Sequence, residues 1–227
     1  MTRDHPLHET PAGSLPTVPA AADSTGSDAG AGRPLLERAA IVATARQIIA
    51  EHGLEALSLR RIGDTMGVTA PALYAHVDDK QDLLRAVAEL QMEELLTRYE
   101  AVRVDDPLDR VRGHCRAYLD LARDEPELFR VMFLFPPDLG PGARSDLPDD
   151  LALPAATRAF LVATDAIDDA IAQGQIVSDD PLTVALTIWA SIHGMATILQ
   201  MGFGLPEDLE RGLIDEVIDR ILRAYRA

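Results

Sequence analysis

The chain has 227 residues, of which 47% are hydrophobic and only 4% are aromatic. This length allows one large or two small domains with a substantial hydrophobic core. Alanine, leucine, arginine and acidic residues dominate, which favours helices over strands. The single cysteine, Cys115, excludes an internal disulfide and a zinc site built from several cysteines, and it fits a reducing cytoplasm.

Charge is distributed unevenly along the chain. The net charge is -16 and the pI is near 4.6, which for the whole chain argues against nucleic acid because phosphate binding needs positive surface. Residues 33–85, however, carry seven basic and seven acidic side chains, whereas residues 86–227 carry thirteen and twenty-six. Lys80, the only lysine in the sequence, lies in the segment without net charge.

Two segments are informative about disorder and about cellular location. Residues 1–32 are rich in proline and glycine and have no apolar period, so we expect a disordered tail. They also lack the basic-then-apolar pattern of a signal peptide. Residues 182–201 are apolar enough to raise a membrane span, but the polar side chains among them favour a buried core helix in a cytoplasmic protein without membrane contact.

The rest of the sequence shows helical periodicity and no convincing strand. A first helix is expected from near Pro34 to Gly53, followed by a short helix that begins at Ser58, a good N-cap. Later helices are expected at 106–123, 126–134, 151–173, 180–201 and 207–226, with a loop at 136–150. The fold class is therefore predicted to be all-α.

The segment after Ser58 has the organisation of a helix-turn-helix unit. Gly67 makes a tight turn, Thr69 caps a third short helix, and Asp78 is expected to cap a fourth that runs to about Arg103. Such a unit needs an apolar inner face, which fixes the angle between its helices. It also needs small or polar residues on the outer face of its second helix, because that helix enters the major groove of DNA.

The run LSLRRIGDTMGVTAPALYAHVDDKQDLL resembles the DNA-binding module of the tetracycline-repressor (TetR) family. The matching positions, in chain order, are Gly53, Ile62, Gly67-Val68, Leu73-Tyr74, His76-Val77, Lys80 and Leu83-Leu84. The resemblance implies a helix-turn-helix DNA-binding domain at 33–80. It also implies that residues 81–227 form a helical regulatory, ligand-binding and dimerisation domain.

The resemblance also implies roles for individual residues. Lys80 begins the fourth helix and contacts a DNA phosphate, and a helix N-terminus favours an anion there. Arg60 matches a position that reads a guanine edge. The full set of expected DNA contacts is Ser58, Arg60, Arg61, Thr69, Ala70, Pro71, Ala72, Tyr74, His76 and Lys80.

Some residues depart from the family pattern. The recognition helix carries no arginine, lysine, asparagine or glutamine, so specificity is expected to depend on Arg60 and on DNA shape. Ala75 stands where a bulky aromatic residue is common. Asp78 and Asp79 place negative charge beside Lys80, which weakens attraction to a phosphate.

In the family, the larger C-terminal part dimerises and usually binds a small molecule. The segment 180–201 is apolar nearly all round, so we expect it to pair, with 207–226, against its copy in a second protomer. The alternative is a monomeric core. Trp189, His193 and Gly194 form a Trp-xxx-His-Gly pattern that resembles one subgroup of the family. The candidate ligand-binding residues are His114, Tyr118, Phe133, Phe160, Trp189 and His193, with core packing as the alternative for each.

These observations predict a transcription regulator, most simply a repressor that binds a palindromic operator in double-stranded DNA as a homodimer and is released by a small-molecule effector. Asp165, Asp168 and Asp169 lie at helical spacing, but no histidine, glycine-rich loop or nucleophile complements them. We therefore expect no enzyme activity, cofactor or metal. The alternative function is a small-molecule-binding helical protein or all-α enzyme without useful DNA binding.

Overall fold

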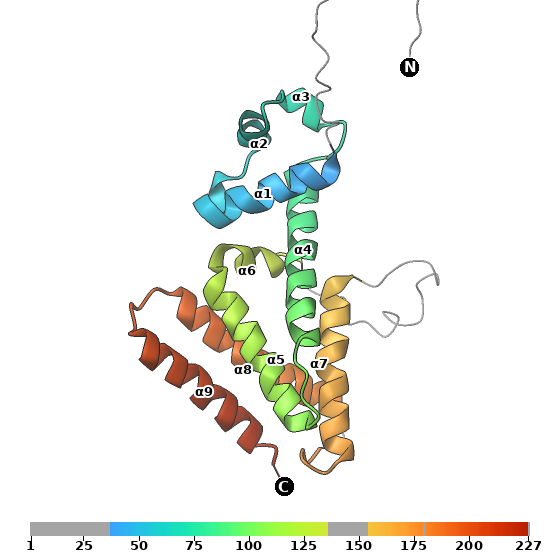
Figure 1. The fold of residues 1–227 in the computed structure, drawn as a ribbon, viewed down its shortest axis with the longest axis vertical. Coiled ribbons are helices and arrows are strands. Elements are labelled where there is room, and N and C mark those ends of the chain that lie inside the picture. The colour runs from blue at the N-terminus through green and yellow to red at the C-terminus, as the bar shows by residue number, and fades with distance from the viewer. Residues whose placement is uncertain (1–36, 136–153, 179, 227) are drawn as a thin grey trace, which may run out of the picture. The chain divides into compact units, whose positions relative to one another are not determined.

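The computed structural model describes residues 37–135, 154–178 and 180–226, which form helices and turns with no strand (Figure 1). The predicted all-helical class is confirmed. The predicted tail at 1–32 and the predicted loop at 136–150 lie outside the described residues. The elements are α1 (Arg38–His52), the 3-10 turn η1 (Leu54–Ala56), α2 (Leu59–Met66), α3 (Ala70–Leu73), α4 (Lys80–Glu100), α5 (Pro107–Asp124), α6 (Pro126–Met132), α7 (Ala155–Ala172), α8 (Pro181–Gln200) and α9 (Glu207–Arg223).

Of the three predicted N-caps, one makes the expected side-chain hydrogen bond. Thr69 occupies the N-cap position of α3, but its side chain makes no capping hydrogen bond. Ser58 caps α2, because its Oγ accepts a hydrogen bond from the Arg61 amide at 3.1 Å. The prediction that Asp78 caps α4 is wrong. Asp79 is the cap, and its carboxylate accepts from the Asp82 amide at 2.8 Å. Asp78 lies one residue outside the helix, where its own amide donates to the Asp82 carboxylate.

The helix-turn-helix unit depends on a close approach of two backbones. The Gly67 backbone is left-handed, with a φ of 67°, and this turns the chain from α2 into α3. Opposite the turn, a Cβ on Gly63 would lie 2.8 Å from the carbonyl oxygen of Val68. Only glycine therefore lets α2 pack this tightly against the segment that leads to α3.

Helix α4 connects two hydrophobic clusters. Its first half, with Leu83 and Val87, packs in the cluster of α1, α2 and α3, and its second half, with Leu95 and Tyr99, packs in the cluster of α5, α7, α8 and α9 (Figure 1). The short helix α6 also contributes to both clusters, with Leu128 and Val131 in the first and Phe129 and Met132 in the second. Helices α4 and α6 are thus the elements that the two clusters share.

A partly buried polar contact lies where the clusters meet. The carboxylate of Glu125, between α5 and α6, accepts hydrogen bonds from Arg46 of α1 and Gln91 of α4, both at 2.7 Å. Gln91 has no exposed surface. Since a buried amide is costly unless it is hydrogen-bonded, this contact fixes how α1 sits against α4 and the start of α6.

Helix α8 is long and apolar enough to cross a membrane by length and composition, a test that core helices also pass. One face of it is buried in the second cluster, and the helix contacts α5, α7 and α9. Outside this face, the side chains of Leu182, Leu186 and Ile198 are exposed. This two-sided apolar character agrees with a helix that serves an interior and an interface.

Candidate functional site

The helix-turn-helix unit presents one outward face. Ile62, Leu73 and Val77 are buried, as their spacing predicts. The expected DNA contacts lie on the other side: Ser58, Arg60, Arg61, Thr69, Pro71, Ala72 and Tyr74 are exposed, and Ala70 and His76 are partly exposed. The side chain of Arg60 is 91% exposed, and its Nε lies 3.9 Å from the carboxylate of Asp64.

Lys80 is the first residue of α4, and its side chain is exposed. Within the described residues it makes no side-chain hydrogen bond or ion pair. Of its acidic neighbours, Asp79 directs its carboxylate at the amide of Asp82 and so offsets the positive end of the helix. The ammonium group therefore stands at a helix N-terminus with its donors unused, although the two aspartates lower the local potential.

An ion pair joins the start of α1 to the start of α4 and to the segment that follows α3. Arg38 donates to both carboxylate oxygens of Asp82, at 2.6 and 2.7 Å, and to the backbone carbonyl of His76 at 2.9 Å. The hydrogen bonds to Arg38 lower the pKa of Asp82 to about 2. Sequence reasoning missed this pair, because 44 residues separate its members and no periodic pattern links them.

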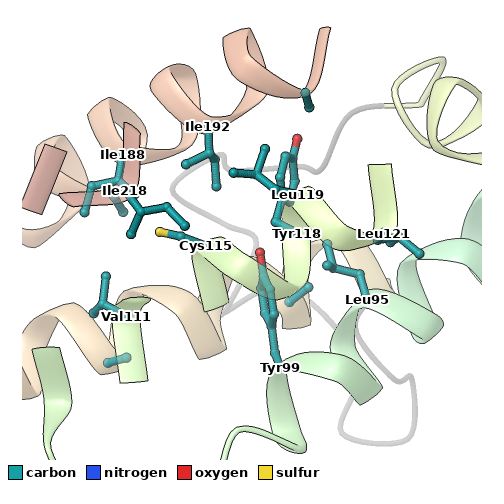
Figure 2. Packing of buried hydrophobic residues seen from close by; sticks show 14 of the residues in the cluster. Leu95, Tyr99, Val111, Cys115, Tyr118, Leu119, Leu121, Ile188, Ile192 and Ile218 are labelled. Atoms are coloured by element: carbon teal, nitrogen blue, oxygen red, sulfur yellow. The ribbon is translucent and has the colours of Figure 1, made fainter. Parts of the chain in front are cut away.

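A cavity lies among α4, α5, α7 and α8, and its free volume is about 70 Å³. Figure 2 shows Tyr99 on α4, Cys115 and Tyr118 on α5 and Ile188 on α8 in the cluster that surrounds it. The lining side chains are Met92, Leu95, Tyr99, Val111, His114, Cys115, Tyr118, Phe133, Ala156, Ala159, Phe160, Ala163, Ile167, Ala185, Ile188, Trp189 and Ile192. No carboxylate, lysine or arginine is among these described residues.

Five of the six predicted ligand-binding residues line this cavity, namely His114, Tyr118, Phe133, Phe160 and Trp189. His193 is not among the lining residues. Its Nδ1 lies 2.8 Å from the hydroxyl of Tyr118, and its ring packs at 4.5 Å from that of Phe133. Trp189 donates its indole N–H to the same hydroxyl at 3.1 Å. His193 therefore supports the wall of the cavity through Tyr118.

Burial keeps the polar groups of the wall uncharged. It lowers the pKa of His114 to about 4, with a smaller contribution from the positive charge of Arg110. It raises the pKa of the Cys115 thiol to about 12 and the pKa of the Tyr118 hydroxyl well above its usual value. Imidazole, thiol and phenol are therefore all neutral near neutral pH.

Comparison with known proteins finds matches to one family in both the N-terminal and the C-terminal part of the chain. Residues 41–87 match bacterial regulatory proteins of the tetR family, and residues 111–225, half of the chain, match the tetracyclin repressor-like C-terminal domain. The chain belongs to the TetR family. The resemblance read from the helix-turn-helix sequence is confirmed, and the family consists of transcriptional regulators rather than enzymes.

Individual TetR-family relatives are distant. An uncharacterized HTH-type transcriptional regulator of Mycobacterium tuberculosis is 27% identical over 191 residues, which are 83% of this chain and 79% of that protein. Tetracycline repressor protein class C of Escherichia coli is 40% identical over 57 residues, only 25% of this chain and 26% of that protein. A structure of a protein of unknown function from Rhodococcus sp. RHA1 has a TM-score of 0.65 at 26% identity and covers 84% of this chain and 95% of its own.

Sequence reasoning overlooked what makes room for the cavity in this TetR-family chain. Ala156, Ala159 and Ala163 of α7 lie at helical spacing along the cavity wall. Their small side chains leave space that larger residues would fill. The alanine spacing is visible in the sequence, but the side chains that face it come from three other helices, so the space itself becomes visible only in the folded chain.

Proposed function

We propose that this TetR-family chain is a transcriptional repressor that binds a palindromic operator as a homodimer and is released by a small-molecule effector. The observation that carries the proposal is the pairing of an outward face, from which Arg60 and Lys80 project, with an uncharged cavity in the second cluster. A regulator needs both, because an effector shifts DNA affinity only through a different affinity for two conformations.

Exposed apolar side chains on α8 and α9 support the homodimer. They include Leu182 and Leu186 on α8 and Leu209 and Leu213 on α9. Helices α8 and α9 pack against each other, so their outward faces adjoin. Burial of these faces against a second copy would remove this surface from water and would set two recognition helices roughly 34–36 Å apart, one turn of DNA.

The C-terminal domain is further proposed to belong to the Trp-His-Gly subgroup. Support comes from the order of Trp189, His193 and Gly194 in α8 and from the common contact of Trp189 and His193 with the hydroxyl of Tyr118. The shared contact gives the spacing of the motif a physical purpose, because residues four apart lie on one helix face. A cytoplasmic location follows from the proposed action on DNA.

The proposal is tested by selecting bound duplexes from a random DNA pool with the purified full chain at low salt. We expect enrichment of a palindromic consensus with half-sites one DNA turn apart. A folded protein that enriches no sequence would contradict the proposal and would favour a helical small-molecule-binding protein without useful DNA binding.

Two substitutions then assign the roles on the face. Lys80→Ala is expected to weaken binding about tenfold or more on all sequences, because a charge-assisted contact is lost in each protomer, and to reduce the salt dependence. Gln81→Ala, at the exposed neighbouring position, is the control. Arg60→Ala is expected to cost about 1–3 kcal/mol and to relax the preference at one base pair. If Arg60→Ala weakened binding to specific and to random DNA by the same factor, the proposal that Arg60 reads a base would be wrong.

A further inference from the structure

The cavity is suited to an uncharged ligand. Its described wall contains no ionised side chain at neutral pH, since the imidazole of His114 and the thiol of Cys115 are both kept neutral by burial. A charged molecule placed there would lose its hydration without gaining a counter-charge, a cost of several kcal/mol. An apolar molecule meets mostly alanine, leucine, isoleucine and aromatic surface.

Two polar groups on the wall, the indole of Trp189 and the hydroxyl of Tyr118, are hydrogen-bonded to each other. Trp189 has a single donor, and it is used on the hydroxyl of Tyr118 at 3.1 Å. The Nδ1 of His193 lies 2.8 Å from the same hydroxyl and is hydrogen-bonded to it, as donor or acceptor according to the tautomer of the imidazole. The three side chains form a chain of hydrogen bonds that positions Tyr118.

His114 is different. Its side chain is only 4% exposed, and among the described residues its Nδ1 has no hydrogen-bond partner. The ring also forms a hydrogen bond with the backbone of Tyr99, and this bond raises the pKa of His114. Because Nδ1 is unpartnered, Nε2 is the nitrogen available to that carbonyl. The neutral ring therefore carries its proton on Nε2 and keeps Nδ1 as a buried acceptor.

An unsatisfied buried acceptor costs about 1–3 kcal/mol. The ring is held in place by stacking on Tyr99, with 4.7 Å between the ring centroids. A donor group on a bound molecule would remove this cost. A ligand that satisfies this acceptor must carry a hydrogen-bond donor.

The size of the cavity limits the ligand. About 70 Å³ of free volume is less than the roughly 150 Å³ of an apolar protein cavity that binds benzene. Phe133 and Phe160 are only partly buried, so these two side chains have room to move aside. Small outward movements of both would admit a molecule with one ring.

We propose that the cavity binds a small, uncharged, largely apolar molecule with a hydroxyl or N–H group, which donates a hydrogen bond to Nδ1 of His114. This inference rests on the proposed function in one respect, because it names the chemistry of the effector. The binding itself requires no DNA, so its failure and the failure of operator binding are separate results.

The test uses five one-ring probes that differ in their polar group: phenol, anisole, toluene, benzoate and benzylammonium. The chain has a single tryptophan, Trp189, and this residue lines the cavity, so its fluorescence reports binding directly. We expect phenol to bind about two- to tenfold more tightly than anisole or toluene, as one neutral hydrogen bond predicts. Benzoate and benzylammonium are expected not to saturate. Tighter binding of either ion than of phenol, or no saturable binding of any probe to folded protein, would overturn the proposal.

The role of His114 is tested with His114→Phe, which keeps a ring and removes the acceptor. The preference for phenol over toluene is expected to disappear while toluene still binds. His52→Phe, at an exposed histidine of α1 outside the cavity, is the control and is expected to keep the preference. A preference that survives in His114→Phe would overturn the assignment.

A measurement on the unaltered protein covers the case in which His114→Phe does not fold. Nitrogen NMR of labelled histidine distinguishes an acceptor nitrogen that is hydrogen-bonded from one that is free. Phenol is expected to shift the Nδ1 resonance of His114, and anisole, which has no donor, is expected to leave it in place. Equal shifts with both probes would show that the hydroxyl does not reach this nitrogen.

Discussion

The DNA-reading face and the cavity are built in different ways. The face comes from two short helices and one turn, and its shape depends on local features: the cap at Ser58, the left-handed Gly67 and the close approach at Gly63. The cavity takes side chains from four helices that are distant in the sequence. Local rules therefore determine the shape of the face, whereas only the packed core determines what lines the cavity.

The two regions meet at few points. Helices α4 and α6 belong to both hydrophobic clusters, and the hydrogen bonds among Arg46, Gln91 and Glu125 lie at the junction. Within the described residues, α4 and α6 are the elements through which a ligand in the cavity would be expected to move the face. Variants that affect the face, the cavity or the junction separately therefore test whether this division is real.

The largest expected effect belongs to the cavity and appears on acidification. The pKa of His114 is about 4 in the folded chain, against 6.5 when exposed, so the unfolded chain binds more protons between these values. The contribution of the neutral, buried His114 to the free energy of unfolding is expected to be fully present above pH 6.5. The free energy of unfolding is expected to fall by about 3 kcal/mol as the pH drops from 6.5 to 4. Denaturant unfolding at a series of pH values measures this.

His114→Phe identifies the source of that dependence. The variant is expected to lose most of the fall between pH 6.5 and 4. The low pKa of Asp82, about 2, affects stability mainly below the ordinary aspartate pKa of 3.8, so it contributes little to the fall between pH 6.5 and 4. An unchanged pH profile in the variant would show that His114 is not buried as a neutral ring.

The next largest effect is expected at the junction. Glu125→Ala removes the acceptor for Arg46 and for the fully buried amide of Gln91, which is expected to cost about 2 kcal/mol of stability. Asp124→Ala is the matched control, because this neighbouring carboxylate is exposed and pairs with arginines at the surface, where pairs contribute about 0–1 kcal/mol. Equal unfolding midpoints for the two variants would mean that the junction is not tied by this contact.

Gly63→Ala affects the face alone. The added Cβ would lie 2.8 Å from the carbonyl oxygen of Val68, so α2 and the following turn must separate. We expect a loss of about 1–2 kcal/mol in stability and weaker operator binding, with phenol binding at Trp189 unchanged. Thr65→Ala, at an exposed position of the same helix, is expected to have little effect on stability. Altered probe binding in Gly63→Ala would show that the two regions are not separable.

The difference between local and distant contacts also explains how much of each region the sequence could predict. The helix-turn-helix unit was predictable because Ser58, Gly67 and the inward Ile62, Leu73 and Val77 act within one or two turns of chain. The cap of α4 was misplaced by one residue, since Asp78 and Asp79 are equally good caps by type. Choosing between them requires the contact of Asp82 with Arg38, which is distant in sequence.

For the cavity, the sequence indicated residue types but not their arrangement. Helical spacing placed Trp189 and His193 on one face of α8, yet only Trp189 lines the cavity, because Tyr118 lies between the cavity and His193. The unpartnered Nδ1 of His114 has no sequence signal at all. Whether a polar atom is satisfied depends on every helix that packs around it.

The smallest expected effect concerns Ser58, which has both a structural and a functional prediction. As the N-cap of α2 its hydroxyl oxygen accepts from the Arg61 amide, and Ser58→Ala is expected to cost about 1 kcal/mol of stability. Ser58→Asn is expected to restore most of that loss, because asparagine caps as well as serine. If the hydroxyl also donates to a DNA phosphate, operator affinity stays reduced in Ser58→Asn after stability has recovered. If affinity recovers together with stability, the contribution of Ser58 to DNA binding is the cap alone, and the face is then determined by backbone geometry at this position. Denaturant unfolding and operator titration of the same three proteins separate these outcomes.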